Sequence, residues 1–177
     1  EFLPALSTMF ATVYRFPKPV VAAINGHAVA GGCVLAAAAD RRLMARDGGR
    51  IGVTELLVGV PFPSMALEIM RGCVAPQHFA ESLLGGATYE PADAMARALV
   101  DEVVEPGVLL ERAVAAAARL ADLSPVAFAL TKRQIPEFKA TGNPALDDAL
   151  KTLREIEVSR AAEQEQIVSE VNTRGGA

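Results

Sequence analysis

The sequence contains few of the residues that characterise several common kinds of protein. Its 177 residues include no tryptophan, and only 5% are aromatic, which favours close-packed helices over a sandwich of aromatic-rich strands. The two cysteines, Cys33 and Cys73, form no CxxC spacing, so neither a disulfide framework nor a cysteine-based metal site is expected. We therefore expect two free thiols in a reducing cytoplasm.

Charge and hydropathy exclude two further kinds of partner. The formal net charge is −4 and the pI is near 5.3, and no cluster of lysine and arginine residues could track a phosphate backbone, so nucleic acid is not expected to bind. No apolar run approaches the roughly 20 residues that cross a bilayer, and no signal segment opens the sequence. We predict a cytoplasmic protein with no membrane partner. Metal clusters, dinucleotide and P-loop motifs and a serine elbow are likewise absent from the sequence.

What the sequence does contain is a central segment, residues 18–59, that combines a buried strand, a glycine pair before a helix and one carboxylate among apolar residues. The strand is the apolar run Val20–Ile24, which lies between a proline and an Asn-Gly turn. Such a run is typical of a strand covered on both faces in a parallel sheet. The sequence therefore predicts an α/β protein.

The glycine pair Gly31-Gly32 precedes Cys33–Ala39, a segment of small and aliphatic residues that predicts a buried helix. Glycine lets a ligand approach the backbone closely, and the first N–H groups of a helix have no partner within it. Such groups bind anions and developing oxyanions. The Gly31 amide is therefore a candidate donor to a carbonyl that becomes enolate-like. The alternative is that the glycines only allow tight packing.

Glu55 is the candidate proton carrier, because it stands among isoleucine, leucine and valine residues. A carboxylate in such surroundings suits a general base or acid that works near neutral pH. The alternative is a capping or surface glutamate at the junction of a strand and a helix. Glu68 is a weaker candidate of the same kind. We interpret His27 as a loop residue beside the pocket, and Cys33 as a small core residue.

Two regions are predicted along the chain. Residues 1–105 are expected to form the α/β core that carries the site, and residues 106–177 a helical region for oligomerisation or for a lid. Helical patterns begin at Pro76 and Pro91, where proline occupies the favoured first position. Another begins at Leu109 and a further one at Pro125. A last helix is predicted from the apolar stripe Leu146, Leu150, Leu153 and Ile156.

These motifs together resemble the crotonase family, the enoyl-CoA hydratases and isomerases. The resemblance rests on the following residues: Lys18-Pro19-Val20-Val21-Ala22-Ala23-Ile24-Asn25-Gly26, Ala30-Gly31-Gly32-Cys33, Asp40, Ile51-Gly52 to Glu55 and Gly59, Tyr89 to Val104, and Thr131-Lys132. It implies a crotonase-like ββα superhelix with a C-terminal helical region, assembled as a homotrimer or hexamer. It also implies an acyl-CoA thioester as substrate, with no separate cofactor and no metal. The first oxyanion-hole amide of the family comes from an upstream loop that these residues do not contain, so either an N-terminal part precedes residue 1 or the oxyanion hole is incomplete.

By the same resemblance, Gly31 matches the second oxyanion-hole amide and Glu55 the second catalytic glutamate. Val34 stands where similar hydratases carry their first glutamate. The pattern is closest to the Δ3,Δ2-enoyl-CoA isomerases, in which one glutamate shuttles a proton. The alternatives are an enoyl-CoA hydratase with a relocated second group and a non-catalytic acyl-CoA-binding or interaction subunit. The residues expected to line the pocket are Val34, Ala30, His27, Val60 and Phe62.

Overall fold

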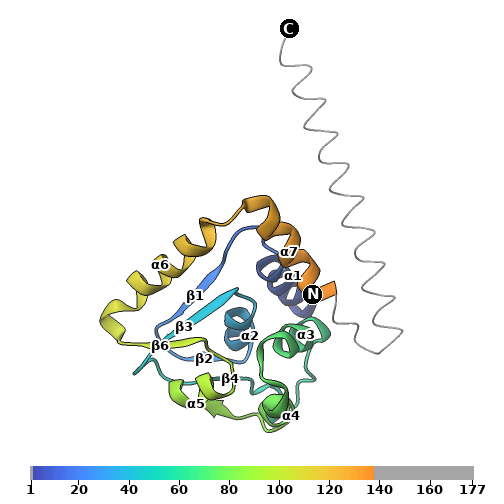
Figure 1. Ribbon diagram of the computed structural model, residues 1–177. Coiled ribbons are helices and arrows are strands. Elements are labelled where there is room, and N and C mark those ends of the chain that lie inside the picture. Colours follow the sequence, from blue (N-terminus) through green and yellow to red (C-terminus); the bar gives the residue numbers. More distant parts are fainter. Residues whose placement is uncertain (1, 138–177) are drawn as a thin grey trace. The chain divides into compact units, whose positions relative to one another are not determined.

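The computed structural model describes residues 2–137, and its strands form two small sheets (Figure 1). The first sheet is parallel, in the order β1-β3-β6. In the second sheet, β2-β4-β5, the β2 and β4 strands are parallel and β5 is antiparallel to β4. The strands are β1 (Val21–Ile24), β2 (Ala28–Val29), β3 (Arg41–Ala45), β4 (Ile51–Gly52), β5 (Thr88–Tyr89) and β6 (Glu102–Val104).

The strand predicted over Val20–Ile24 is confirmed as β1, and its parallel partner is β3. No strand was predicted after the Asn25-Gly26 turn, whereas Ala28–Val29 forms β2. Two such residues are too few to show a periodicity, and their pairing with β4 makes them a strand. The connection from β3 to β4 also passes from one sheet to the other, so these two neighbouring strands do not form a hairpin.

Helices follow the proline and apolar patterns of the sequence. Proline stands at the start of both α4 and α5. The backbone N–H at this position has no partner within a helix, so proline, which lacks one, costs no hydrogen bond there. The helix α1 ends before Pro17, which cannot continue a helix. The helices are α1 (Phe2–Tyr14), α2 (Gly31–Ala37), α3 (Ser64–Cys73), α4 (Pro76–Leu84), α5 (Pro91–Ala96), α6 (Leu109–Ala121) and α7 (Pro125–Glu137), with 3-10 turns η1 (Glu55–Val58) and η2 (Pro106–Val108).

The helix α2 lies at the centre of the main apolar core (Figure 1). Cys33 and Val34 are 0% and 1% exposed, which confirms that this helix is buried. Two residues of this helix are exposed, Gly32 and Leu35, and 39% of Leu35 is accessible to solvent. A second, smaller cluster joins β3 and β6 to α6, through residues that include Leu43 and Leu109. The two clusters place one layer of helices on each side of the first sheet.

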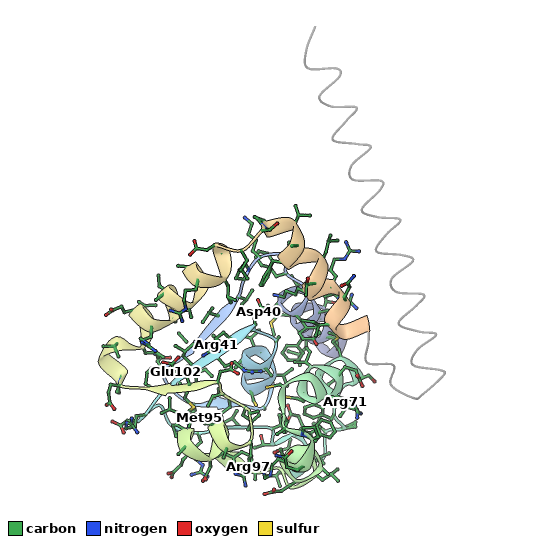
Figure 2. All side chains as sticks on the ribbon, in the orientation of Figure 1. Asp40, Arg41, Arg71, Met95, Arg97 and Glu102 are labelled. Carbon is green, nitrogen blue, oxygen red and sulfur yellow. The ribbon has the colours of Figure 1, made fainter. Side chains whose placement is uncertain are left out.

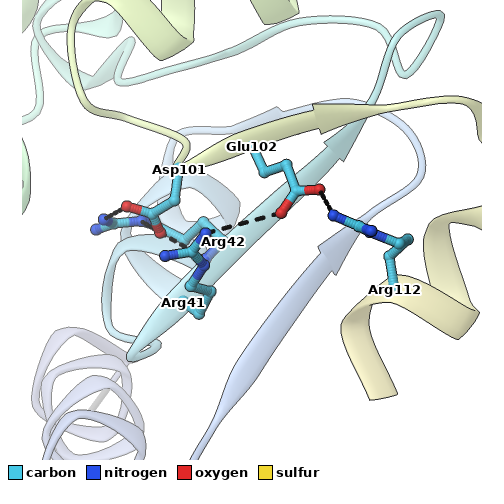
Figure 3. Close-up of polar contacts among 5 residues, drawn as sticks. All are labelled: Arg41, Arg42, Asp101, Glu102 and Arg112. Carbon is cyan, nitrogen blue, oxygen red and sulfur yellow. Dashed lines mark hydrogen bonds and ion pairs between the residues drawn. The ribbon is translucent and has the colours of Figure 1, made fainter. Parts of the chain in front are cut away.

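Polar contacts hold β6 against β3 (Figure 3). Arg42 Nη2 lies 2.7 Å from Asp101 Oδ1, and Arg42 Nε lies 3.1 Å from Asp101 Oδ2. The same Oδ2 accepts a hydrogen bond from the Arg42 backbone N–H at 2.8 Å. Beside this pair, Glu102 forms ion pairs with Arg41 and Arg112. Asp101, directly before β6, and Glu102, its first residue, thus neutralise arginines from both β3 and α6.

A buried lysine ties α7 to the segment between α2 and β3. Lys132 is 8% exposed, and its Nζ lies 2.7 Å from Asp40 Oδ2. The same oxygen accepts the Val20 backbone N–H at 2.8 Å, and Figure 2 labels Asp40 in this position. The predicted division between residues 1–105 and 106–177 stays a prediction. The apolar stripe predicted over residues 146–156 lies outside the described residues.

No single helix in residues 2–137 is both long and apolar enough to span a membrane. Two consecutive helical segments, Pro106–Ala121 and Pro125–Ile135, are together long and apolar enough, but the chain bends by 102° between them. Among the same residues, no group of three or more histidine, cysteine, aspartate or glutamate side chains is placed to hold a metal ion.

Candidate active site

The candidate site lies at the carboxyl ends of β2 and β4. These neighbouring strands are parallel, with Val29 opposite Gly52, and their pairing continues through a 2.9 Å hydrogen bond from Ala30 N–H to Gly52 O. The helix α2 begins directly after β2, and η1 begins with Glu55 shortly after β4. Because carboxyl ends of adjacent parallel strands meet at one edge of a sheet, the fold brings Gly31 and Glu55 to the same edge.

The backbone N–H of Gly31 is directed away from α2. The carbonyl oxygen of Ala30 accepts hydrogen bonds from Cys33 N–H at 2.9 Å and from Val34 N–H at 3.2 Å, so it points into the helix. The described residues contain no cis peptide bond, and in a trans peptide the C=O and N–H point in opposite directions. The Gly31 N–H is therefore oriented to donate to an oxygen outside the helix.

Apolar side chains of α1 cover the Gly31 backbone. A Cβ atom built on Gly31 would lie 3.6 Å from Phe10 Cζ and 4.0 Å from Leu6 Cδ1. Apolar cover of this kind strengthens a hydrogen bond to a developing negative charge, because it keeps the local dielectric low. Leu6 and Phe10 were not among the site residues predicted from the sequence. They lie one helical turn apart in α1, but spacing within one helix cannot show which distant segment that helix covers.

Glu55 opens η1 and has one unpaired oxygen. The turn ends at Gly59, whose φ of 71° is left-handed, and Val60 N–H donates to the Glu55 carbonyl at 3.0 Å. These backbone contacts fix where the side chain starts. Its Oε2 atom is buried and has no hydrogen-bond partner among the described residues. Buried polar atoms are rarely left unpaired, so this oxygen is available to a ligand.

Cys33, in the first turn of α2, is a neutral core residue, as interpreted from the sequence. Burial raises the pKa of its thiol, and the nearby charges of Cys73 and Glu55 raise it further. A thiol that stays protonated is a poor nucleophile.

The other predicted pocket residues lie in different places. Val34 belongs to the main core, and Val60 and Phe62 are half-buried. His27 precedes β2, and its Nδ1 accepts the Arg50 backbone N–H at 3.1 Å. It therefore lies at the amino ends of β2 and β4, whereas Glu55 follows their carboxyl ends. The roles predicted for these residues stay predictions.

A hollow of about 430 Å³ lies beside the candidate site, between β1 and the outer face of α2. His27 and Gly32 are among the residues that line it, but Gly31 and Glu55 are not. The rest of the lining is mainly apolar and comes from residues such as Leu35 and Ala36.

The class is an α/β protein in which one edge of a sheet carries a helix-opening glycine and a half-buried glutamate with one buried, unpaired oxygen. Comparison with known proteins identifies the family. Residues 2–167 match the model of the family described as Enoyl-CoA hydratase/isomerase. The chain belongs to this family, which confirms the resemblance predicted from the sequence.

Relatives of this chain carry related names. A Thermus thermophilus protein named as an enoyl-CoA hydratase is 38% identical over 128 residues, which are 72% of this chain and 50% of that protein. A probable enoyl-CoA hydratase, EchA17, of Mycobacterium tuberculosis is 32% identical over 85% of this chain and 57% of its own length. The chain thus spans about half the length of the curated relatives that it matches.

Solved structures confirm a crotonase fold, of which this chain forms a part. One Mycobacterium tuberculosis protein was described once as the probable enoyl-CoA hydratase EchA3 and once as an enoyl-CoA isomerase. The first structure has a TM-score of 0.72 and 28% identity, and covers 88% of this chain and 66% of that chain. The second has a TM-score of 0.73 and 30% identity, and covers 85% of this chain and 67% of that chain. Because one protein carries both descriptions, these two structures do not distinguish hydration from isomerisation.

Proposed function

We propose that this protein is an enoyl-CoA isomerase that shifts a double bond within an acyl-CoA thioester, with Glu55 as the proton carrier. The observation that supports the proposal most directly is the buried, unpaired Oε2 of Glu55, at the strand edge where the Gly31 N–H points away from α2. Isomerisation moves one proton between two carbons of the same substrate, and one carboxylate can do this. Coenzyme A enters as part of the substrate, and no separate cofactor takes part.

The proposed reaction begins with a 3-enoyl thioester. Glu55 removes a proton from the α-carbon, and the electron pair of that C–H bond moves toward the thioester carbonyl to give a dienolate. The Gly31 N–H donates to the enolate oxygen and stabilises its charge. The dienolate then collapses, its double bond moves to the α,β position, and Glu55 returns the proton to the γ-carbon. Atoms and electrons balance without an added reactant.

Hydration is the second candidate, because relatives of this chain are named as enoyl-CoA hydratases. Adding water calls for one group that activates the water and another that handles the α-proton. Val34 occupies the position at which the resemblance places the first of these carboxylates, and it is a buried aliphatic residue. This supports isomerisation over hydration. A non-catalytic acyl-CoA binder is the third candidate.

Product analysis distinguishes the three candidates. The purified full-length protein is incubated separately with a 3-enoyl-CoA and with a 2-enoyl-CoA, and the products are separated by chromatography and weighed by mass spectrometry. Isomerisation gives 2-enoyl-CoA at unchanged mass, whereas hydration gives 3-hydroxyacyl-CoA with the mass of one added water. If the hydroxyacyl product forms at a rate comparable to that of the double-bond shift, the isomerase proposal is overturned. Binding of the thioester with no turnover would favour the binder.

The predicted homotrimer or hexamer is a separate proposal. Size-exclusion chromatography with light scattering on the full-length protein gives its mass in solution and decides between these states and a monomer.

A further inference from the structure

Ala30 has a backbone conformation that alanine rarely adopts, with φ 54° and ψ −126°. Within residues 2–137, Ala30 and Ala98 are the two non-glycine residues with a positive φ. The Cβ atom of an L-residue disfavours this region, and residues held there are often found at functional sites. The two alanines therefore call for separate explanations.

Ala98 is explained by the end of a helix. It follows α5 directly after the capping residue Arg97, and its φ is 61°. Ala98 N–H donates to Met95 O at 3.0 Å, and Leu99 N–H donates to Ala94 O at 2.9 Å. A left-handed residue with these two bonds is a common way to end a helix.

Ala30 precedes a helix, so this explanation does not apply to it. Three hydrogen bonds hold it instead. Its N–H donates to Gly52 O in β4, and its carbonyl accepts the Cys33 and Val34 N–H groups in α2. The torsion ψ of residue 30 sets the plane of the next peptide, and therefore the direction of the Gly31 N–H. The conformation of Ala30 therefore sets how the Gly31 amide is turned relative to β2 and to β4, which Ala30 contacts through Gly52.

We propose that Ala30 is a positioning residue, whose positive-φ backbone aims the Gly31 N–H at the thioester oxygen. This inference rests on the proposed function, in which Gly31 is the oxyanion donor. If residue 30 took an ordinary extended or helical conformation, the peptide between Ala30 and Gly31 would rotate. An extended N-cap residue keeps its carbonyl bonded within the helix, so the bond from Ala30 N–H to Gly52 O would be lost instead, and the Gly31 N–H would turn relative to β4 and Glu55. The backbone preference of residue 30, and not its side-chain chemistry, then controls the rate.

The test is a series of substitutions that separates backbone preference from side-chain size. Glycine and asparagine tolerate positive φ at turns, whereas valine does not. We expect Ala30→Gly to keep kcat within about threefold of the unaltered protein and Ala30→Val to lower kcat by about 10²-fold, as expected for loss of one oxyanion donor. KM should change far less than kcat, because the ground-state thioester carries less negative charge on its oxygen than the enolate.

Ala98→Gly and Ala98→Val are the matched controls, because they make the same substitutions at the other alanine with a positive φ, which follows the end of a helix. Ala98→Val should lower the unfolding midpoint while leaving kcat unchanged, when activity is measured well below that midpoint. A loss of kcat in Ala98→Val equal to that in Ala30→Val would show a general effect of strain and overturn the proposal. Full activity in a folded Ala30→Val protein would also overturn it.

A further pair of variants keeps the test decisive should Ala30→Val not fold. Ala30→Asn adds a larger side chain than Ala30→Ser, but asparagine is favoured at the first central position of type II′ turns, whose torsions match those of Ala30. The proposal requires the asparagine variant to retain the higher kcat, and the reverse order would reject it. The unaltered protein separates this proposal from the proposed function. If it turns over neither thioester, the function fails and the positioning role with it, whereas an active protein that is insensitive to residue 30 overturns the positioning role alone.

Discussion

The amide nitrogen of Ala30 lies 2.9 Å from the carbonyl oxygen of Gly52, and this hydrogen bond joins the two segments that carry the candidate site. One segment leads into Gly31 and the other into Glu55. The strand β5 packs closely against the other side of this junction, because a Cβ atom built on Gly52 would lie 2.2 Å from Ala87 O and 2.9 Å from Thr88 Cα. The relative position of the amide and the carboxylate therefore depends on a glycine at residue 52.

Gly52→Ala tests this dependence. The added methyl group would collide with backbone atoms of β5, which cannot move aside as a flexible side chain could. We expect a loss of about 1–3 kcal/mol in the free energy of unfolding, measured by urea denaturation. We also expect a lower kcat, because β4 must shift relative to β2. Gly107→Ala is the control, since no atom lies within 4 Å of a Cβ built there. Equal stability of the two variants would contradict the close packing of β5.

Glu55→Gln tests the proton carrier. The amide keeps the size of the side chain but cannot accept and return a proton, so kcat should fall by about 10²–10⁴-fold. The circular dichroism spectrum and the unfolding midpoint should change little. Glu68→Gln is the matched control, because Glu68 lies on α3 and its Oε1 is 3.4 Å from Arg71 Nε. Near-normal turnover by Glu55→Gln would reject the assignment of Glu55.

The sequence predicted much of this fold, because several of its signals are local. Proline at residues 76 and 91 marked the starts of α4 and α5, and both helices begin there. The apolar run Val20–Ile24 predicted β1, and the small residues after Gly31-Gly32 predicted a buried helix. Glu55 was singled out because a carboxylate is unusual among isoleucine and leucine. Each of these signals can be read from a few adjacent residues.

The rest depends on contacts between distant segments. The strands β2 and β5 have two residues each, and only their pairing with β4 makes them strands. The apolar cover of Gly31 comes from Leu6 and Phe10, which lie in α1. The positive φ of Ala30 is equally hidden in the sequence, because alanine normally avoids it. It follows from the bonds that Ala30 makes to β4 and α2.

Asp101→Asn tests the ion pair that joins β6 to β3 (Figure 3). The Arg42 side chain is 12% exposed and that of Asp101 is 25% exposed, so the substitution leaves a largely buried guanidinium without its counter-charge. We expect a loss of about 3 kcal/mol in the free energy of unfolding, the lower end of the range for breaking a buried pair, because Asp101 is partly exposed.

The control for this pair is Glu105→Gln, which removes the partner of Arg46. These side chains are 65% and 61% exposed, so solvent already screens their attraction and the unfolding midpoint should barely change. A similar midpoint for the Asp101 and Glu105 variants would show that burial does not decide the contribution of the Arg42 pair.

The Cys33 thiol gives a prediction about reactivity. Burial, together with the charges of Cys73 and Glu55, raises its pKa above the ordinary value of 9.0. The folded protein should therefore keep this thiol protonated at pH 8, and iodoacetamide should leave Cys33 unmodified until urea is added. Mass spectrometry of the proteolytic peptides reads the modification at each cysteine. Rapid alkylation of Cys33 in the folded protein would contradict its burial in α2.

The same pKa shift makes stability depend on pH. Below about pH 9 the Cys33 thiol is protonated in both the folded and the unfolded chain, so it adds no pH dependence. Above that pH the unfolded chain loses the proton while the folded protein keeps it. The free energy of unfolding should then fall as the pH rises, by up to about 1.4 kcal/mol per pH unit. Urea denaturation at several alkaline pH values measures this slope. Cys33→Ala should show a shallower slope than the unaltered protein, and an unchanged slope would assign the alkaline loss of stability to other groups.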